Sequence, residues 1–213
     1  MLKTVRKRPV PDDGLTREER TRQEILGATR TLVERYGFAK VTLEDIAGAL
    51  GKKKSFLYYY WPDKEAILAA MVAQEGMEID AAIRIALERE TSGKDKISRY
   101  ILQCHQEITK RLPLISHLRH EIQAKEHGSF ALLLEQSRKF LHKDIPMLKK
   151  LVQEGVRDKS LRNMTEVEIE AIANFTAMAL HGVEYNYVMG AADDRMDEYL
   201  VVAIQTLEKG IAA

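Results

Sequence analysis

The chain has 213 residues, of which 45% are hydrophobic and 31% charged. This supplies a substantial buried core, in one unit or in a small domain joined to a larger one. No apolar run approaches the length of a membrane span, and no apolar segment follows the basic N-terminus as a signal peptide requires. The single cysteine, Cys104, excludes an intrachain disulfide and fits a reducing compartment, so we expect a cytoplasmic protein.

Charge is unevenly distributed along the chain. Residues 1–60 contain 13 Lys and Arg against 8 Asp and Glu, whereas the remainder contains 20 against 24. A basic N-terminal module on a mildly acidic body fits a partner that carries phosphates at one end. Residues 1–15, with two prolines and the cluster Arg6 to Arg8, predict a mobile basic arm. It is either a solubilising tail or an arm that reaches a DNA phosphate or the minor groove.

A first long helix is predicted to begin at Thr16. Glu19, three residues later, completes a capping box with Thr16. Gly37 ends the helix. Its apolar residues recur at helical spacing and predict a buried stripe, formed by Ile25, Ala28, Leu32, Val33 and Tyr36.

The stretch from Thr42 to Lys64 predicts two short helices joined by a tight turn. Thr42 and Asp45 have the spacing of a capping box, and Gly51 supplies the positive φ of a helix-ending turn. Leu57, on the second helix, can turn back onto the apolar face of the first helix. That face consists of Ile46, Ala47 and Leu50.

The second short helix carries lysines, a hydroxyl group and tyrosines in one run, KKKSFLYYY from Lys52 to Tyr60. Such side chains, held at a fixed angle by a partner helix, suit major-groove reading of DNA. The alternative is a plain packing hairpin whose lysines form a solvated face. The tyrosines favour DNA binding, because three adjacent tyrosines on a helix cannot all point into one core.

Residues Ile25 to Met71 resemble the DNA-binding domain of the TetR (tetracycline-repressor-like) family of bacterial transcription regulators. The matching residues are Ile25, Leu26 and Ala28; Tyr36 to Phe38; Val41 and Thr42; Asp45 to Ala47; Gly51; Leu57 to Trp61; and Pro62 to Glu65. The resemblance implies an all-α chain with a three-helix helix-turn-helix domain over residues 16–62. A helical ligand-binding and dimerisation domain would follow over residues 63–213, giving about nine helices in all.

The resemblance also implies which residues face DNA. The candidate DNA-contacting residues are Thr42, Lys52, Lys53, Lys54, Ser55, Phe56, Tyr58, Tyr59 and Lys64. Thr42 and Lys64 are expected near phosphates, because helix N-termini attract anions. Lys52, Lys53, Ser55 and Phe56 depart from the residue types common in the family, so the operator sequence stays open. We hypothesise that Phe56 contacts a thymine methyl group.

Beyond residue 62 the pattern is helical throughout, with no alternating strand pattern. Helices are expected over residues 63–90, 97–112, 113–128, 130–155, 165–189 and 193–209, with a kink at Pro146. The last two are apolar on more than one face, which indicates a subunit interface; the family dimerises through these helices as a four-helix bundle. The candidate interface residues are Phe175, Ala179, Val183, Tyr187, Tyr199, Ala203 and Leu207.

By resemblance, the body binds a small-molecule effector, and the eight methionines and the tyrosines favour an apolar or aromatic one. The candidate pocket residues are Ile101, Cys104, His105, Ile108, His117, Phe175 and Met178. Cys104 lies on an apolar stripe, so we interpret it as a core residue rather than a redox sensor. We expect a homodimeric repressor, released from a pseudo-palindromic operator when the effector binds.

Two other functions stay open. A helical metal-dependent enzyme or metal-binding protein would use His105, His117, His120 and His181 as ligands. A non-specific nucleic-acid binder would use the lysines as a charge patch, with affinity that follows salt rather than sequence. The chain has no glycine-rich phosphate loop, HExxH motif or nucleophile elbow. We therefore expect neither an enzyme nor a cofactor.

Overall fold

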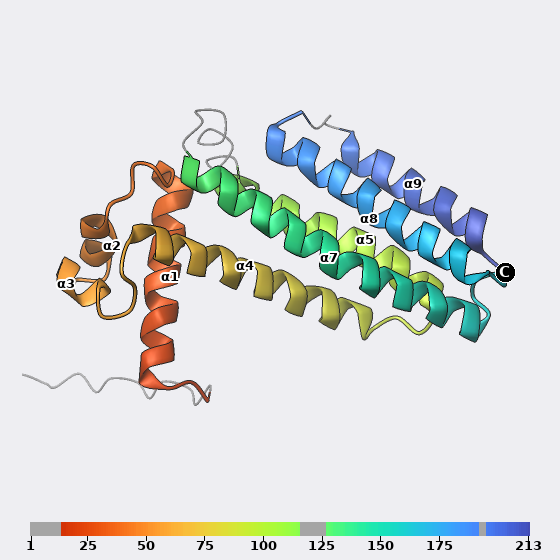
Figure 1. Ribbon diagram of the computed structural model, residues 1–213, viewed down its shortest axis with the longest axis horizontal. Coiled ribbons are helices and arrows are strands. Elements are labelled where there is room, and N and C mark those ends of the chain that lie inside the picture. The colour runs from red at the N-terminus through yellow and green to blue at the C-terminus, as the bar shows by residue number, and fades with distance from the viewer. Residues whose placement is uncertain (1–13, 116–126, 192–194) are drawn as a thin grey trace, which may run out of the picture.

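The computed structural model describes residues 14–115, 127–191 and 195–213, and these are mostly helical (Figure 1). The helices whose two ends lie within these ranges are α1 (Arg17–Tyr36), α2 (Leu43–Ala49), α3 (Lys54–Leu57), α4 (Lys64–Leu87), α5 (Gly93–Lys110), α7 (His127–Asp158), α8 (Glu166–Met189) and α9 (Met196–Ile211). Within these ranges there is no strand, only an isolated bridge between Leu161 and Ala212. The predicted all-α fold is confirmed.

Some predictions fall outside the described residues. They are the basic arm, except for its last two residues, and most of the helix predicted over residues 113–128, with His117 and His120. None of the described helices has the length and apolar character needed to cross a membrane.

Local capping signals fix where several helices begin. Thr16, Thr42 and Thr165 each form a complete capping box, with Glu19, Asp45 and Glu168 respectively. Asp63 and Ser92 cap α4 and α5 through side-chain oxygens that accept backbone N–H bonds. These bonds satisfy amides that the first turn of a helix leaves without partners.

The buried apolar side chains form two separate clusters. An N-terminal cluster joins α1, α2, α3 and the first turns of α4, and it includes Ile25, Ile46, Leu57 and Ile67. A body cluster extends from Ile79 on α4 to Ile211 on α9. Helix α4 contributes to both clusters and runs from the hairpin along the body (Figure 1). Tyr36, expected on the buried stripe, is instead 46% exposed, with the Arg35 guanidinium over its ring.

Helix α5 is the central element of the body, in contact with α4, α7, α8 and α9, while α7 packs mainly on α8 and α5. The start of α5 meets the end of α7 backbone to backbone. A Cβ atom at Gly93 would stand 2.1 Å from the backbone nitrogen of Gly155, and Gly93 N donates to Asp158 Oδ2 at 2.7 Å. Only glycine permits this approach.

Candidate functional site

The hairpin formed by α2 and α3 has a buried inner face. Ile46 and Ala47 on α2 and Leu57 on α3 are almost fully buried in the N-terminal cluster. Gly51 has φ of 64°, in the left-handed region, and Lys52 N donates to Ala47 O at 2.8 Å across the turn. The turn that the sequence predicts from Gly51 is therefore present, and it fixes α3 against α2.

The outer face of the hairpin presents part of the predicted DNA-contacting set to solvent. Lys52, Lys53 and Ser55 are exposed. Tyr58 is 51% and Tyr59 76% exposed. Two ammonium groups, a hydroxyl group and two phenols are thus exposed within residues 52–59, a composition suited to phosphate and base-edge contacts.

Two other candidates are engaged in local bonds. Lys54 Nζ lies 3.0 Å from Glu44 Oε1 on α2; this pairing raises the pKa of Lys54 and lowers the pKa of Glu44. Thr42 Oγ1 donates to Asp45 Oδ2 at 2.6 Å in its capping box, and these bonds lower the pKa of Asp45. The Thr42 hydroxyl group has one proton and must leave Asp45 to donate to DNA, whereas the Lys54 ammonium group has two further N–H donors.

Lys64 and Phe56 are turned partly toward the protein. Lys64 Nζ donates to Phe38 O at 3.2 Å and lies 4.4 Å from the centre of the Phe38 ring. Phe56 is half-buried against the N-terminal cluster, 5.2 Å from the Tyr60 ring between centroids. These contacts leave Lys64 and Phe56 less available to DNA than the sequence led us to expect.

Arg22 on α1 contacts the end of the hairpin at Tyr60 and Trp61. The sequence did not indicate this residue. Its guanidinium carbon lies 5.6 Å from the Tyr60 ring centre and 5.2 Å from that of Trp61. Its Nη1 also donates to Tyr60 O at 3.4 Å. Arg22 therefore packs its cation on two aromatic rings, a favourable cation–π arrangement, and orients the tyrosine run relative to α1.

A buried charge network joins the two clusters. Arg111, which caps the end of α5, donates from Nε to Glu75 Oε2 at 2.7 Å and from Nη1 to Glu107 Oε2 at 2.6 Å. Glu75 on α4 also pairs with Arg30 on α1, 3.0 Å from Nη1 to Oε1. Leu114, three residues beyond Arg111, is buried in the N-terminal cluster. Through Arg111 the end of α5 thus contacts both α4 and, via Glu75, α1.

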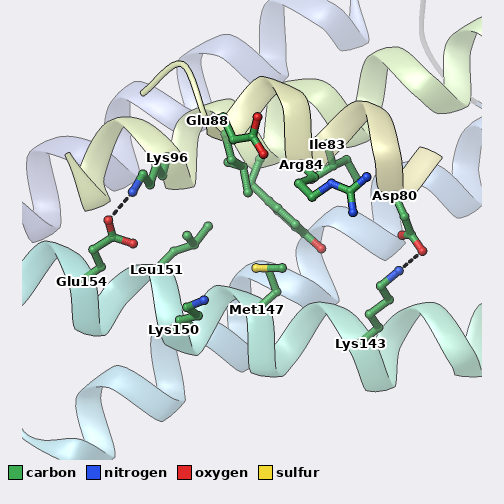
Figure 2. Close-up of a pocket in the computed structure, with 12 residues that line it drawn as sticks. Asp80, Ile83, Arg84, Glu88, Lys96, Lys143, Met147, Lys150, Leu151 and Glu154 are labelled. Carbon is green, nitrogen blue, oxygen red and sulfur yellow. Dashed lines mark hydrogen bonds and ion pairs between the residues drawn. The ribbon is translucent and has the colours of Figure 1, made fainter. Parts of the chain in front are cut away.

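A slot of about 570 Å³ opens between α4 and α7, with α5 behind it (Figure 2). Ile83 and Leu87 from α4, Tyr100 from α5, and Met147 and Leu151 from α7 supply its apolar surface. This volume is in the range of small-molecule sites. An ion pair stands at each end of the view in Figure 2: Asp80 with Lys143, and Lys96 with Glu154.

None of the predicted pocket residues that the structure describes lines this slot. Ile101, Cys104 and His105 are buried and Ile108 is half-buried, but none of them lines the slot, and His117 lies outside the described residues. Phe175 and Met178 are 74% and 65% exposed on α8. They lie on the outer surface because their side of α8 faces away from the body cluster.

Behind Tyr100 lies a cluster of titratable side chains from three helices. Tyr100 Oη donates to Asp144 on α7, and burial raises the pKa of Tyr100. His181 on α8 lies between two carboxylates, with Nε2 2.9 Å from Asp144 Oδ2 and Nδ1 3.3 Å from Glu184 Oε2. Asp144 and then Glu184 raise the pKa of His181 to about 9. Burial raises the pKa of the adjacent Cys104 thiol, which agrees with a core role.

Of the four histidines in the metal hypothesis, the two that the structure describes, His105 and His181, have other partners. His105 Nε2 lies 2.7 Å from Asp197 Oδ1 on α9, and Tyr187 Oη donates to the same oxygen at 2.9 Å. His181 contacts the two carboxylates described above. Across the part of the chain that the structure describes, no three His, Cys, Asp or Glu side chains are grouped to hold a metal ion.

The last two helices expose apolar side chains in quantity. Phe175 and Ala179 on α8, and Tyr199 and Ala203 on α9, are exposed. Val183, Tyr187 and Leu207, from the same predicted set, are half-buried, with Tyr187 turned toward His105 at 5.1 Å between rings. The exposed apolar face also includes residues outside the predicted set: Val167, Met178, Tyr185, Val201 and Val202.

A helix-turn-helix hairpin with lysines and tyrosines outward is the arrangement through which helix-turn-helix proteins bind DNA. The family model of bacterial regulatory proteins, tetR family, matches residues 25–71. HTH-type transcriptional regulator YjdC of Escherichia coli (strain K12) is 33% identical over 81 residues, which span 37% of this chain and only 42% of that protein. The match to the TetR-family DNA-binding domain thus covers residues 25–71, which include the hairpin.

Solved structures extend the likeness of fold beyond that domain. A transcriptional regulator from Cytophaga hutchinsonii superposes with a TM-score of 0.71 at 21% identity, covering 90% of this chain and 98% of its own. A regulator from Saccharomonospora viridis, in complex with choline, superposes with a TM-score of 0.65 at 14% identity, over 92% and 99% of the two chains. At these identities the likeness shows the shared fold of the body.

Proposed function

We propose that the protein is a cytoplasmic, homodimeric repressor that binds a pseudo-palindromic operator and leaves it when a small molecule occupies the body. The observation that carries the proposal is the exposed run of Lys52, Lys53, Ser55, Tyr58 and Tyr59 on a hairpin whose inner face is fully packed. A rigid support lets these side chains read base edges rather than only attract phosphate.

The dimer would form through the exposed apolar faces of α8 and α9. Monomeric proteins rarely expose contiguous apolar patches of this kind, and Phe175 and Met178 are large side chains left at the surface. A two-fold axis through this face would place one hairpin on each half of the operator.

The effector would enter the slot between α4 and α7. The regulator from Saccharomonospora viridis shows that a relative of this fold holds a small ligand. We divide the chain into a DNA-binding domain over residues 16–62 and a ligand-binding domain over residues 63–213. Helix α4 contributes to the slot and to the N-terminal cluster, so an effector that prefers one position of α4 must alter DNA affinity, and DNA must alter effector affinity equally.

Selection of bound sites from a random duplex pool by the full-length protein tests the proposal. The expected outcome is one pseudo-palindrome with half-sites about one helical turn apart. A Tyr59→Ala variant should enrich the site weakly, while Met77→Ala, on α4 and exposed outside the hairpin, the slot and the α8–α9 face, serves as the control. Absence of enrichment by folded wild-type dimer would favour the non-specific binder. Stoichiometric zinc or iron in the purified protein would instead favour the metal hypothesis.

A further inference from the structure

The charges around the slot do not cancel. Seven charged side chains line it, and two ion pairs, Asp80 with Lys143 and Lys96 with Glu154, account for four of them. Among the described residues, the other three, Arg84, Glu88 and Lys150, have no ion-pair partner. Two cations against one carboxylate leave the lining with one excess positive charge.

The two unpaired cations project from opposite walls. Arg84 belongs to α4 and Lys150 to α7; in Figure 2 Arg84 lies in the upper part of the view and Lys150 in the lower part, with Met147 and Leu151 between them in height. Both are exposed. They therefore stand at the mouth, while the apolar side chains form the interior. An arginine and a lysine at the rim of an apolar slot suit an anionic group, because low-dielectric walls strengthen the attraction.

The interior suits an apolar chain or ring rather than a second polar group. Tyr100 presents its ring to the slot, because its hydroxyl group is already donating to buried Asp144. Ile83, Leu87, Met147 and Leu151 offer no hydrogen-bonding side chain. A polar group buried there would lose water without gaining a partner.

From this arrangement we propose that the slot binds an amphipathic anion, with its apolar body between Leu87, Tyr100 and Met147 and its single anionic head at Arg84 and Lys150. This deepens the effector assignment and rests on the proposed function for its regulatory meaning. The apolar effector expected from sequence thereby acquires a charged end. The ligand would contact α4, the helix that also contributes to the N-terminal cluster.

Isothermal titration of the full-length protein with three ten-carbon probes tests the inference. Decanoate, decan-1-ol and decylamine share the apolar chain and differ in head-group charge, and each is used below its micellar concentration. Decanoate should bind about 10-fold or more tightly than decanol, as charge-assisted hydrogen bonds give, and decylamine most weakly. A fourth probe, decyl phosphate, should also bind more tightly than decanol, because the site recognises the negative charge of the head group.

Substitutions in the slot test which residues give the preference for the anionic head group. The double variant Arg84→Met and Lys150→Met should reduce the preference for decanoate to within about 2-fold of decanol, whereas Arg89→Met, an exposed arginine just beyond α4, should leave it unchanged. Met147→Trp, which fills the slot, should abolish binding of both probes. Equal affinity for all three head groups, a preference for decylamine, or no binding of decanoate overturns the inference. No DNA is present, so such a failure leaves the operator selection to decide the proposed function separately.

Discussion

The hairpin domain and the helical body are stabilised by different kinds of interaction. The hairpin depends on local features: a capping box at Thr42, a left-handed glycine at Gly51 and a buried Leu57. The body depends on contacts between distant segments, including the pairing of buried Asp144 on α7 with half-buried His181 on α8. The hairpin is thus encoded in a short stretch, whereas the body is assembled from five helices, α4, α5, α7, α8 and α9, and contains charged groups in its interior.

The largest expected effect lies where the two regions meet. Arg111→Met removes the buried cation that Glu75 and Glu107 share, which should lower the free energy of unfolding by about 3–5 kcal/mol. Urea unfolding can be followed at Trp61, the single tryptophan, and by circular dichroism. Arg89→Met is the control, and a loss below about 1 kcal/mol for Arg111→Met would contradict a structural role for the network.

Next in size are the two cores themselves. Leu57→Ala in the hairpin and Leu148→Ala in the body both remove fully buried side chains and should each cost roughly 3 kcal/mol. Leu57→Ala should shift mainly the Trp61 fluorescence transition and weaken operator binding. Leu148→Ala should shift mainly the circular dichroism transition. If each variant shifts both signals equally, the two clusters unfold as one cooperative unit and the comparison fails.

The body should also depend on pH through His181. Its pKa of about 9 in the folded protein exceeds the ordinary value of 6.5. Protonated His181 therefore stabilises the folded state fully below pH 6.5, and this stabilisation is lost as the pH rises through 9. The loss should be on the order of 2 kcal/mol. The facing groups are Asp144, Glu184, Tyr100 and Cys104; the raised pKa values of the phenol and the thiol keep both neutral in this window.

Chemical unfolding of wild type and of His181→Gln at pH 6, 7.5 and 9 measures this term. The variant should be less stable at pH 6 and should lose less stability than wild type between pH 6 and 9. The same pH profile in both proteins would show that His181 does not carry the dependence.

The smallest effects should come from the helix caps. Thr42→Ala and Thr165→Ala each remove the side chain of a capping box and should each cost about 1 kcal/mol. Thr42→Ala should act on the Trp61 transition and Thr165→Ala on the circular dichroism transition. Thr→Ser at either position keeps the capping oxygen and should restore most of the loss; failure of Ser to do so would assign the effect to the methyl group.

The sequence could predict what neighbouring residues determine. The caps at Thr16 and Thr42, the turn at Gly51 and the helical character of the body follow from spacing and backbone preference, and the structure has them. Tyr36 shows the limit of a periodic pattern, because a helix ends there and its last side chain need not meet the core.

The slot and the junction could not be predicted in the same way. Arg22 meets Tyr60 38 positions away, and Arg111 meets Glu75 36 positions away, and neither spacing has a sequence signature. The slot depends on how α4, α5 and α7 are placed side by side, so an apolar stripe on α5 alone indicated Ile101 and Cys104, which face the core. Tyr100 lines the slot because adjacent residues of a helix point in different directions, so its side chain points away from that of Ile101.

The affinity ratio between the selected operator and a scrambled duplex tests the central claim most directly. It should be measured for full-length protein at one fixed, near-physiological salt concentration. Specific reading by the hairpin predicts a ratio of about 10³ or more, which Lys53→Ala and Tyr59→Ala should reduce. A ratio near one, with affinity that follows salt alone, would contradict the account and leave the lysines as a charge patch.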